Sequence, residues 1–238
     1  MATIQDKDGN IIQSMEDWAT IYTSGNKAKQ WKEGRSAYSI ADFVINHHGL
    51  EKIKSRVEEI IQDQIEIDIV IPENEIMFDS FRPGRVHDLG IYSKGPVFIG
   101  VESKVDEPFG PSISDAYLDS ISKAIGGSRT NKPERIEKLL KDQFKKPDRS
   151  LFNLRYQLLY AVAGTRAAGR KKSILYTIVF KTDQYDDLKG VENFRDYLNF
   201  LQAVNAKEDP VSQPDSLVHR FYLRRKELIS IYEQLKWK

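Results

Sequence analysis

The sequence contains no cysteine among its 238 residues, and only four histidines. Disulfide bridges, thiolate zinc sites and a cysteine nucleophile are therefore excluded. A zinc hydrolase is disfavoured because there is no His-Glu-x-x-His pattern, and the adjacent His47 and His48 cannot share one metal. The glycine-rich strings GxxxxGK[ST] and GxGxxG are also missing, which sets aside the common nucleotide-binding loops.

Long apolar runs are missing as well. No segment approaches the roughly 20 apolar residues that span a bilayer, and residues 1–10 lack the apolar core of a signal peptide. We therefore expect a cytoplasmic protein that is not bound to membranes. Its length and its 40% apolar content predict a single domain over residues 1–238, with residues 1–34 forming an irregular N-terminal region packed on it.

Charge is distributed unevenly along the chain, although the formal net charge is only +1. Residues 50–79 hold nine acidic and three basic side chains, whereas residues 123–149 hold nine basic and four acidic ones. Further basic clusters lie within residues 166–172 and 220–226. Such clusters can attract a polyanion to one face, but the alternative for each is an ordinary solvated surface.

The apolar pattern changes period several times and predicts an α/β fold. We expect a mixed central β-sheet flanked by helices on both faces. Helical spacing is found over residues 34–49, with Ser36 as the N-cap, and over 50–62, 112–125, 134–144, 149–169 and 191–204. Strand patterns are found over residues 65–71, 75–81, 86–92, 96–104, 173–180, 219–225 and 228–237.

The stretch FIGVESKVDEPFG, residues 98–110, begins as a buried strand and turns abruptly charged. Alternation along the strand places Glu102 and Lys104 on one face. If residues 94–96 form the loop of a hairpin, Asp88 lies opposite Glu102, with the two side chains about 5 Å apart. A two-residue loop would shift this register by one position.

Two facing carboxylates repel each other unless a positive charge lies between them. A hard cation such as Mg²⁺ could supply that charge, since it binds carboxylates, waters and phosphates. It would polarise a phosphoryl oxygen and activate a water, while Lys104 orients the water or stabilises developing charge. The alternative is a salt-bridge cluster of Asp88, Glu102 and Lys104 at the end of the sheet.

The pattern of Asp88, a fourteen-residue step and then Glu102-Ser103-Lys104 resembles the PD-(D/E)xK nuclease superfamily, which has the restriction-endonuclease-like fold. The strings VESKVDEPFG and RYQLLYA further resemble an uncharacterised bacterial set of predicted nucleases within it. About 30 residues match distinctively. His87 replaces the proline of the motif.

The resemblance implies particular roles for several residues. Asp88, Glu102 and the carbonyl of Ser103 would bind Mg²⁺, with Mn²⁺ as a substitute, and Lys104 would be the catalytic lysine. Glu59, or its neighbour Glu58, would add a carboxylate from the preceding helix. The resemblance further implies Gln157 near the active site, with Arg155 beside it on a helix; the alternative is a pair on the helix surface.

We therefore expect a metal-dependent nuclease that hydrolyses phosphodiester bonds, with DNA favoured over RNA. One alternative is a catalytically silent module of the same fold that binds nucleic acid or protein. Another is a structural protein with an incidental salt-bridge cluster, and a homodimer stays open. The residues expected to contact nucleic acid are Arg155, Arg129, Lys132, Arg166, Arg170 and Lys171.

Overall fold

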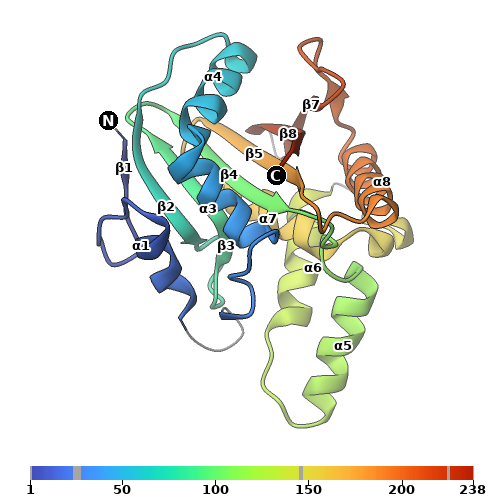
Figure 1. Cartoon of the computed structure of the whole chain (residues 1–238). Coiled ribbons are helices and arrows are strands. Elements are labelled where there is room, and N and C mark those ends of the chain that lie inside the picture. The colour runs from blue at the N-terminus through green and yellow to red at the C-terminus, as the bar shows by residue number, and fades with distance from the viewer. Residues whose placement is uncertain (1, 24–27, 145–146, 224–225, 238) are drawn as a thin grey trace.

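The protein is built on a mixed eight-stranded β-sheet, seen in a computed structural model of the chain (Figure 1). The structure describes residues 2–23, 28–144, 147–223 and 226–237. The strands lie in the order β1-β2-β3-β4-β5-β8-β7-β6, and β4, β5 and β8 run parallel at its centre. Their bounds are β1 (Thr3–Ile4), β2 (Ile67–Ile76), β3 (Arg85–Ser93), β4 (Val97–Lys104), β5 (Lys172–Lys181), β6 (Lys207–Glu208), β7 (Ser216–Leu223) and β8 (Lys226–Lys236).

Helices cover both faces of the sheet, which confirms the predicted α/β class (Figure 1). The bounds are α1 (Met15–Ala19), α3 (Ser36–Asn46), α4 (Gly49–Ile61), α5 (Ile113–Ile125), α6 (Lys132–Gln143), α7 (Tyr156–Ala167) and α8 (Asp187–Ala203), with the 3₁₀ helices η1 (Thr20–Tyr22) and η2 (Arg149–Asn153). One core lies under α3 and α4, and a second lies under α7 and α8. None of the helices in the described ranges is long and apolar enough to cross a membrane.

The β3–β4 hairpin has the predicted register. Leu89 pairs with Val101 and Gly90 with Gly100, as a loop over residues 94–96 requires. The following helix also begins as its capping pattern indicates, because the Ser112 side chain accepts a hydrogen bond from the Asp115 amide. Local sequence therefore sets both the hairpin and the start of α5.

The long helix predicted over residues 149–169 is wrong, because the chain divides it into η2 and α7. The break lies at Leu154 and Arg155, which have extended backbone angles. There the Leu154 carbonyl accepts from the Ile113 amide at 2.8 Å, and the Tyr156 amide donates to the Pro111 carbonyl at 3.0 Å. Pairing with a segment some 40 residues away thus replaces two helical hydrogen bonds, which helical spacing cannot reveal.

The separate strand predicted over residues 75–81 is also wrong. Strand β2 continues to Ile76, and the chain then forms an irregular loop. Arg135 of α6 holds this loop by donating to Asp79 Oδ1 and to the Pro83 carbonyl, both at 2.8 Å. A buried arginine from another helix therefore decides the conformation.

The N-terminal residues pack on the sheet through short elements. Strand β1 pairs in parallel with β2, and Trp18 of α1 is fully buried in the core under α3 and α4. The Tyr22 ring stacks on Trp31 with ring centroids 5.1 Å apart. These aromatic side chains join the N-terminal region to the body of the molecule.

Candidate functional site

The alternation of side chains along β3 is interrupted at Asp88. Leu89 belongs to the core under α3 and α4, so strict alternation would place His87 on that same face. Instead His87 lies against α7, with Nε2 3.4 Å from Thr165 Oγ1. His87 thereby reaches Glu102, which also lies on the α7 face.

Glu102 is buried and bonded through both of its carboxylate oxygens. Oε1 lies 2.8 Å from His87 Nδ1, and Oε2 forms an ion pair with Arg85 Nη2. Burial alone would raise the pKa of Glu102, but Arg85, His87 and Lys104 outweigh it and hold the pKa at about 2. Glu102 is therefore a carboxylate at any ordinary pH, and its negative charge is already balanced.

The pKa of Asp88 is shifted in the opposite direction to that of Glu102. Its partly buried carboxylate accepts a hydrogen bond from the Ser103 amide at 2.6 Å. Burial, and then the negative charges of Glu102 and Glu73, raise the pKa of Asp88 to about 7, against the opposing effects of Lys104 and that amide. A positive charge placed beside Asp88 would lower this pKa and favour the ionised form.

Lys104 and Gln157 meet beside Glu102 at the end of β4. Lys104 Nζ donates to Gln157 Oε1 at 3.2 Å, and Gln157 Nε2 donates to Glu102 Oε2 at 3.3 Å. Lys104 is only 8% exposed, and its amine lies 5.5 Å from the centre of the Phe109 ring. The structure thus brings together three residues predicted as catalytic, with Asp88 on the adjacent strand.

The helix glutamate predicted as a further metal ligand lies elsewhere. Glu59 forms an ion pair with Arg56 at 2.6 Å, and Arg56 donates to Ser216 of β7. Strands β5 and β8 separate β7 from β4, so Glu59 does not join Asp88 and Glu102. Glu58, the other candidate, binds the Ile65 amide. Helical spacing could not decide which strand either glutamate would meet.

Arg85, His87 and Glu73 are the site residues that the sequence pattern did not identify. Arg85 and His87 precede Asp88 by three and one positions, but only the broken alternation turns both toward Glu102. Glu73 of β2 raises the pKa of Asp88 and accepts from the Tyr22 hydroxyl at 2.8 Å. The excess of acidic residues over positions 50–79 includes Glu73 but does not distinguish it from the other acids there.

The predicted nucleic-acid contacts fall into two regions. Lys132 lies over the ring of Tyr156, the neighbour of Gln157, and Arg129 is exposed in the α5–α6 connection. By contrast, Lys171 is next to Lys172, which pairs with Val97 at the start of β4. That position is about 23 Å along β4 from Lys104.

The other basic residues are similarly divided. Arg170 donates to the Gly95 carbonyl at the same far end of the hairpin, and Arg166 lies nine residues after Gln157 on α7. Arg155 is held by Asp196 and Glu192 of α8. The basic residues at 145–146 and 224–225 lie outside the described residues.

The carboxylate oxygens of Asp88 and Glu102 are suitable ligands for a divalent cation, but they already bond to other groups of the protein. Asp88 and Glu102 offer the oxygen ligands that Mg²⁺ prefers. However, no group of three or more His, Asp or Glu side chains in the described ranges is arranged as a metal site. Because Arg85 and His87 bond to Glu102, a cation can use this carboxylate only by competing with them.

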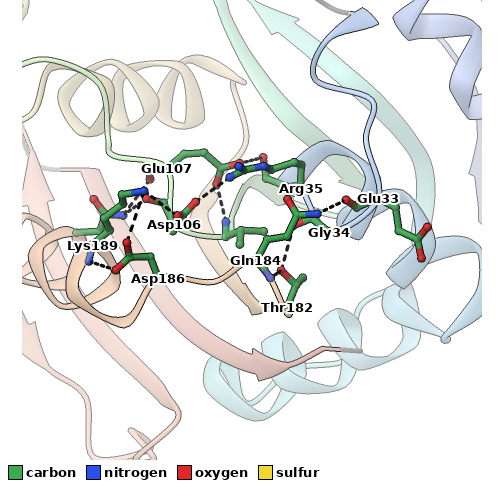
Figure 2. Close-up of polar contacts among 12 residues, drawn as sticks. Glu33, Gly34, Arg35, Asp106, Glu107, Thr182, Gln184, Asp186 and Lys189 are labelled. Carbon is green, nitrogen blue, oxygen red and sulfur yellow. Dashed lines mark hydrogen bonds and ion pairs between the residues drawn. The ribbon is translucent and has the colours of Figure 1, made fainter.

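Asp106 and Glu107, which follow β4, bond to residues at the starts of α3 and α8. Figure 2 shows Asp106 between Arg35, at 3.0 Å, and Lys189 of α8, at 3.2 Å. Ser36 begins α3 without capping it, and its hydroxyl donates to Glu107 Oε1 at 3.0 Å. The charged end of FIGVESKVDEPFG therefore serves two purposes, with Glu102 and Lys104 at the site and the later acids as structural links.

Comparisons with known proteins leave the activity open. No curated protein and no solved structure matches the chain. A family model, described as a domain of unknown function (DUF6946), matches residues 11–234. The match includes every strand from β2 to β7 and all of the candidate site residues. The chain therefore belongs to the DUF6946 family.

Proposed function

We propose that the protein is a metal-dependent phosphodiesterase of the PD-(D/E)xK kind, acting on nucleic acid and on DNA in preference to RNA. The observation that carries this proposal is the contact of Lys104 with Gln157 and of Gln157 with Glu102 at the end of a central strand. The adjacent Asp88 adds a second carboxylate. We also propose a cytoplasmic location, and a homodimer is an arrangement to be tested by sedimentation.

Each residue has a distinct role in this proposal. Asp88 and Glu102 would hold Mg²⁺ or Mn²⁺, with the Ser103 carbonyl as a third oxygen donor. The bound metal supplies Lewis acidity toward a phosphoryl oxygen and a more acidic water. Gln157 positions the buried Lys104 amine, which stabilises negative charge developing on the phosphate. Lys132 and Arg129 contact the neighbouring backbone phosphates.

The test is cleavage of duplex DNA, single-stranded DNA and RNA by purified protein with Mg²⁺ or Mn²⁺. We expect cleavage that EDTA abolishes, and a loss of at least about 100-fold in Asp88→Ala and Lys104→Ala. Lys94→Ala is the matched control, since Lys94 is exposed and pairs with Glu66 at the far end of the hairpin. The proposal fails if no substrate is cut and Asp88→Ala leaves metal binding unchanged.

The Arg85–Glu102 ion pair favours a second candidate, a module that binds nucleic acid without cutting it. With this pair closed, Glu102 is neutralised by the protein itself and requires no metal. Electrophoretic mobility of a labelled duplex separates the two candidates. A binding module shifts the duplex in EDTA and leaves it intact after Mn²⁺ is added, whereas a nuclease degrades it.

A further inference from the structure

Arg85 uses few of its hydrogen-bond donors although it is buried. A guanidinium group carries five N–H donors. Arg85 is 7% exposed, its Nη2 binds Glu102, and its Nε has no acceptor among the described residues. A buried donor without an acceptor is costly, so it usually marks a missing partner. The strongest partner for a guanidinium is an oxyanion such as carboxylate or phosphate.

The aliphatic part of the Arg85 side chain packs against α7, and its guanidinium group lies beside Glu102. Its guanidinium lies over the Tyr160 ring, 5.6 Å from the centroid. Gly164 of α7 approaches so closely that a β-carbon there would come 2.6 Å from Arg85 Cβ and Cγ. The base of the side chain is thus fixed by α7, and movement is confined to the end that contacts Glu102.

We propose that Arg85 exchanges partners, leaving Glu102 for a phosphate oxygen of the substrate when a divalent cation takes Glu102. This inference rests on the proposed function and assigns Arg85 as a phosphate-binding residue. The cation replaces the positive charge that Arg85 gives to Glu102. The released guanidinium then offers its donors, Nε among them, to the phosphate that approaches the metal.

The exchange has a thermodynamic consequence that does not depend on cleavage. In the absence of phosphate, Arg85 competes with the cation, so it weakens metal binding. Because phosphate draws Arg85 away, phosphate and metal each strengthen the binding of the other by the same factor. A purely structural Arg85–Glu102 pair would produce no such contribution from Arg85.

The test is calorimetric titration of Mn²⁺ into the full chain and into Arg85→Gln. We expect Arg85→Gln to bind Mn²⁺ about tenfold more tightly than the unaltered protein. Arg220→Gln is the matched control, since Arg220 pairs with Asp209 and Glu227 on the far side of the sheet, and its Mn²⁺ affinity should not change. Equal Mn²⁺ affinity in Arg85→Gln and the unaltered protein overturns the inference.

A second measurement compares the unaltered protein with Arg85→Lys, in case Arg85→Gln does not fold. The dinucleotide thymidylyl-(3′→5′)-thymidine serves as the phosphodiester probe. We expect Mn²⁺ to tighten its binding, and the coupling to fall in Arg85→Lys, which keeps the charge but loses the forked donors. Equal coupling in both proteins overturns the inference, and if the unaltered protein still cleaves DNA the proposed function survives. Absence of both Mn²⁺ binding and cleavage removes the proposed function and the inference together.

Discussion

Asp88 and Glu102 lie on one hairpin and share a site, yet their carboxylates have different bonding partners. Glu102 is bonded to a guanidinium and an imidazole, whereas Asp88 receives one backbone amide and the repulsion of two other acids. Burial raises the pKa of both groups, and their different partners then bring the pKa of Glu102 down to about 2 while that of Asp88 stays at about 7. Replacing Asp88 by an amide should therefore raise the free energy of unfolding, whereas replacing Glu102 by an amide should lower it.

We expect Asp88→Asn to stabilise the metal-free protein at pH 8. The folded-state pKa of Asp88 is about 7, above its unfolded value. The free energy of unfolding therefore falls as the pH rises from about 4 to 7, because Asp88 ionises less readily in the folded protein than in the unfolded chain. The amide removes this loss and should raise the free energy of unfolding by about 2 kcal/mol at pH 8, and by much less at pH 4. Urea unfolding in EDTA at both pH values measures the effect. A lower stability of Asp88→Asn at pH 8 would contradict the prediction.

We expect Glu102→Gln to destabilise the protein by about 3 kcal/mol at pH 7, because it leaves Arg85 buried without a counter-charge. The folded-state pKa of Glu102 is below its unfolded value, so this contribution is present above about pH 4.5 and is lost as the pH falls toward 2. Urea unfolding from pH 7 to pH 3 follows the loss. Glu66→Gln is the control, because it breaks only the exposed pair with Lys94 and should leave the free energy of unfolding nearly unchanged.

At the scale of elements, the site depends on how closely α7 approaches β3 and β4. Gly164 lies against Arg85 and His87, and a β-carbon at Gly100 would come 2.8 Å from Thr165 Oγ1. These two glycines let the helix reach the sheet, so that Gln157 contacts Lys104 and Glu102. The break at Arg155 starts α7 at the position that directs Gln157 to the site.

We expect Gly164→Ala to lower the free energy of unfolding by about 2 kcal/mol, since the added methyl group cannot be accommodated without moving α7 or Arg85. Thermal unfolding measures this loss, and Mn²⁺ titration reports the accompanying movement of Arg85. Gly95→Ala is the control, because the nearest atom to its added β-carbon is 3.8 Å away. Equal stability of the two variants would show that α7 has more room than the structure gives it.

For the whole molecule, local rather than net charge has to account for nucleic-acid binding, since the chain carries a formal charge of only +1. Of the predicted basic residues, Lys132 lies over the ring of Tyr156, the neighbour of Gln157, whereas the basic end of the hairpin near Gly95 lies at the opposite end of β4. A duplex bound at the site should therefore depend on Lys132.

We expect Lys132→Glu to weaken duplex binding about tenfold at 50 mM salt and to reduce the dependence of affinity on salt, because each lost phosphate contact lowers counterion release. Fluorescence anisotropy in EDTA, from 50 to 200 mM salt, measures both quantities. Lys94→Glu is the control at the opposite end of the hairpin and should change neither. If Lys94→Glu weakens binding as strongly as Lys132→Glu, the duplex does not lie over the site.

Much of the architecture was predictable because it depends on local patterns. The two-residue period predicted β2, the turn-forming string at residues 94–96 predicted the β3–β4 hairpin with its register, and a continuously apolar run predicted the central β5. The Ser112 cap predicted the start of α5. The resemblance to known sequences placed Gln157 near the site, and its contact with Lys104 was seen only in the structure.

Local sequence patterns were enough to predict most of the helices and strands, and the carboxylates and lysine that end the hairpin, because those features depend on neighbours a few residues apart. Local patterns could not predict the partner of Glu102, the place of Glu59 or the division of the helix at Arg155. Each of these depends on contacts between distant segments. The positive charge beside Glu102, expected from a metal or from Lys104, thus comes from Arg85 three positions before Asp88, because the interrupted alternation turns that part of β3 toward α7.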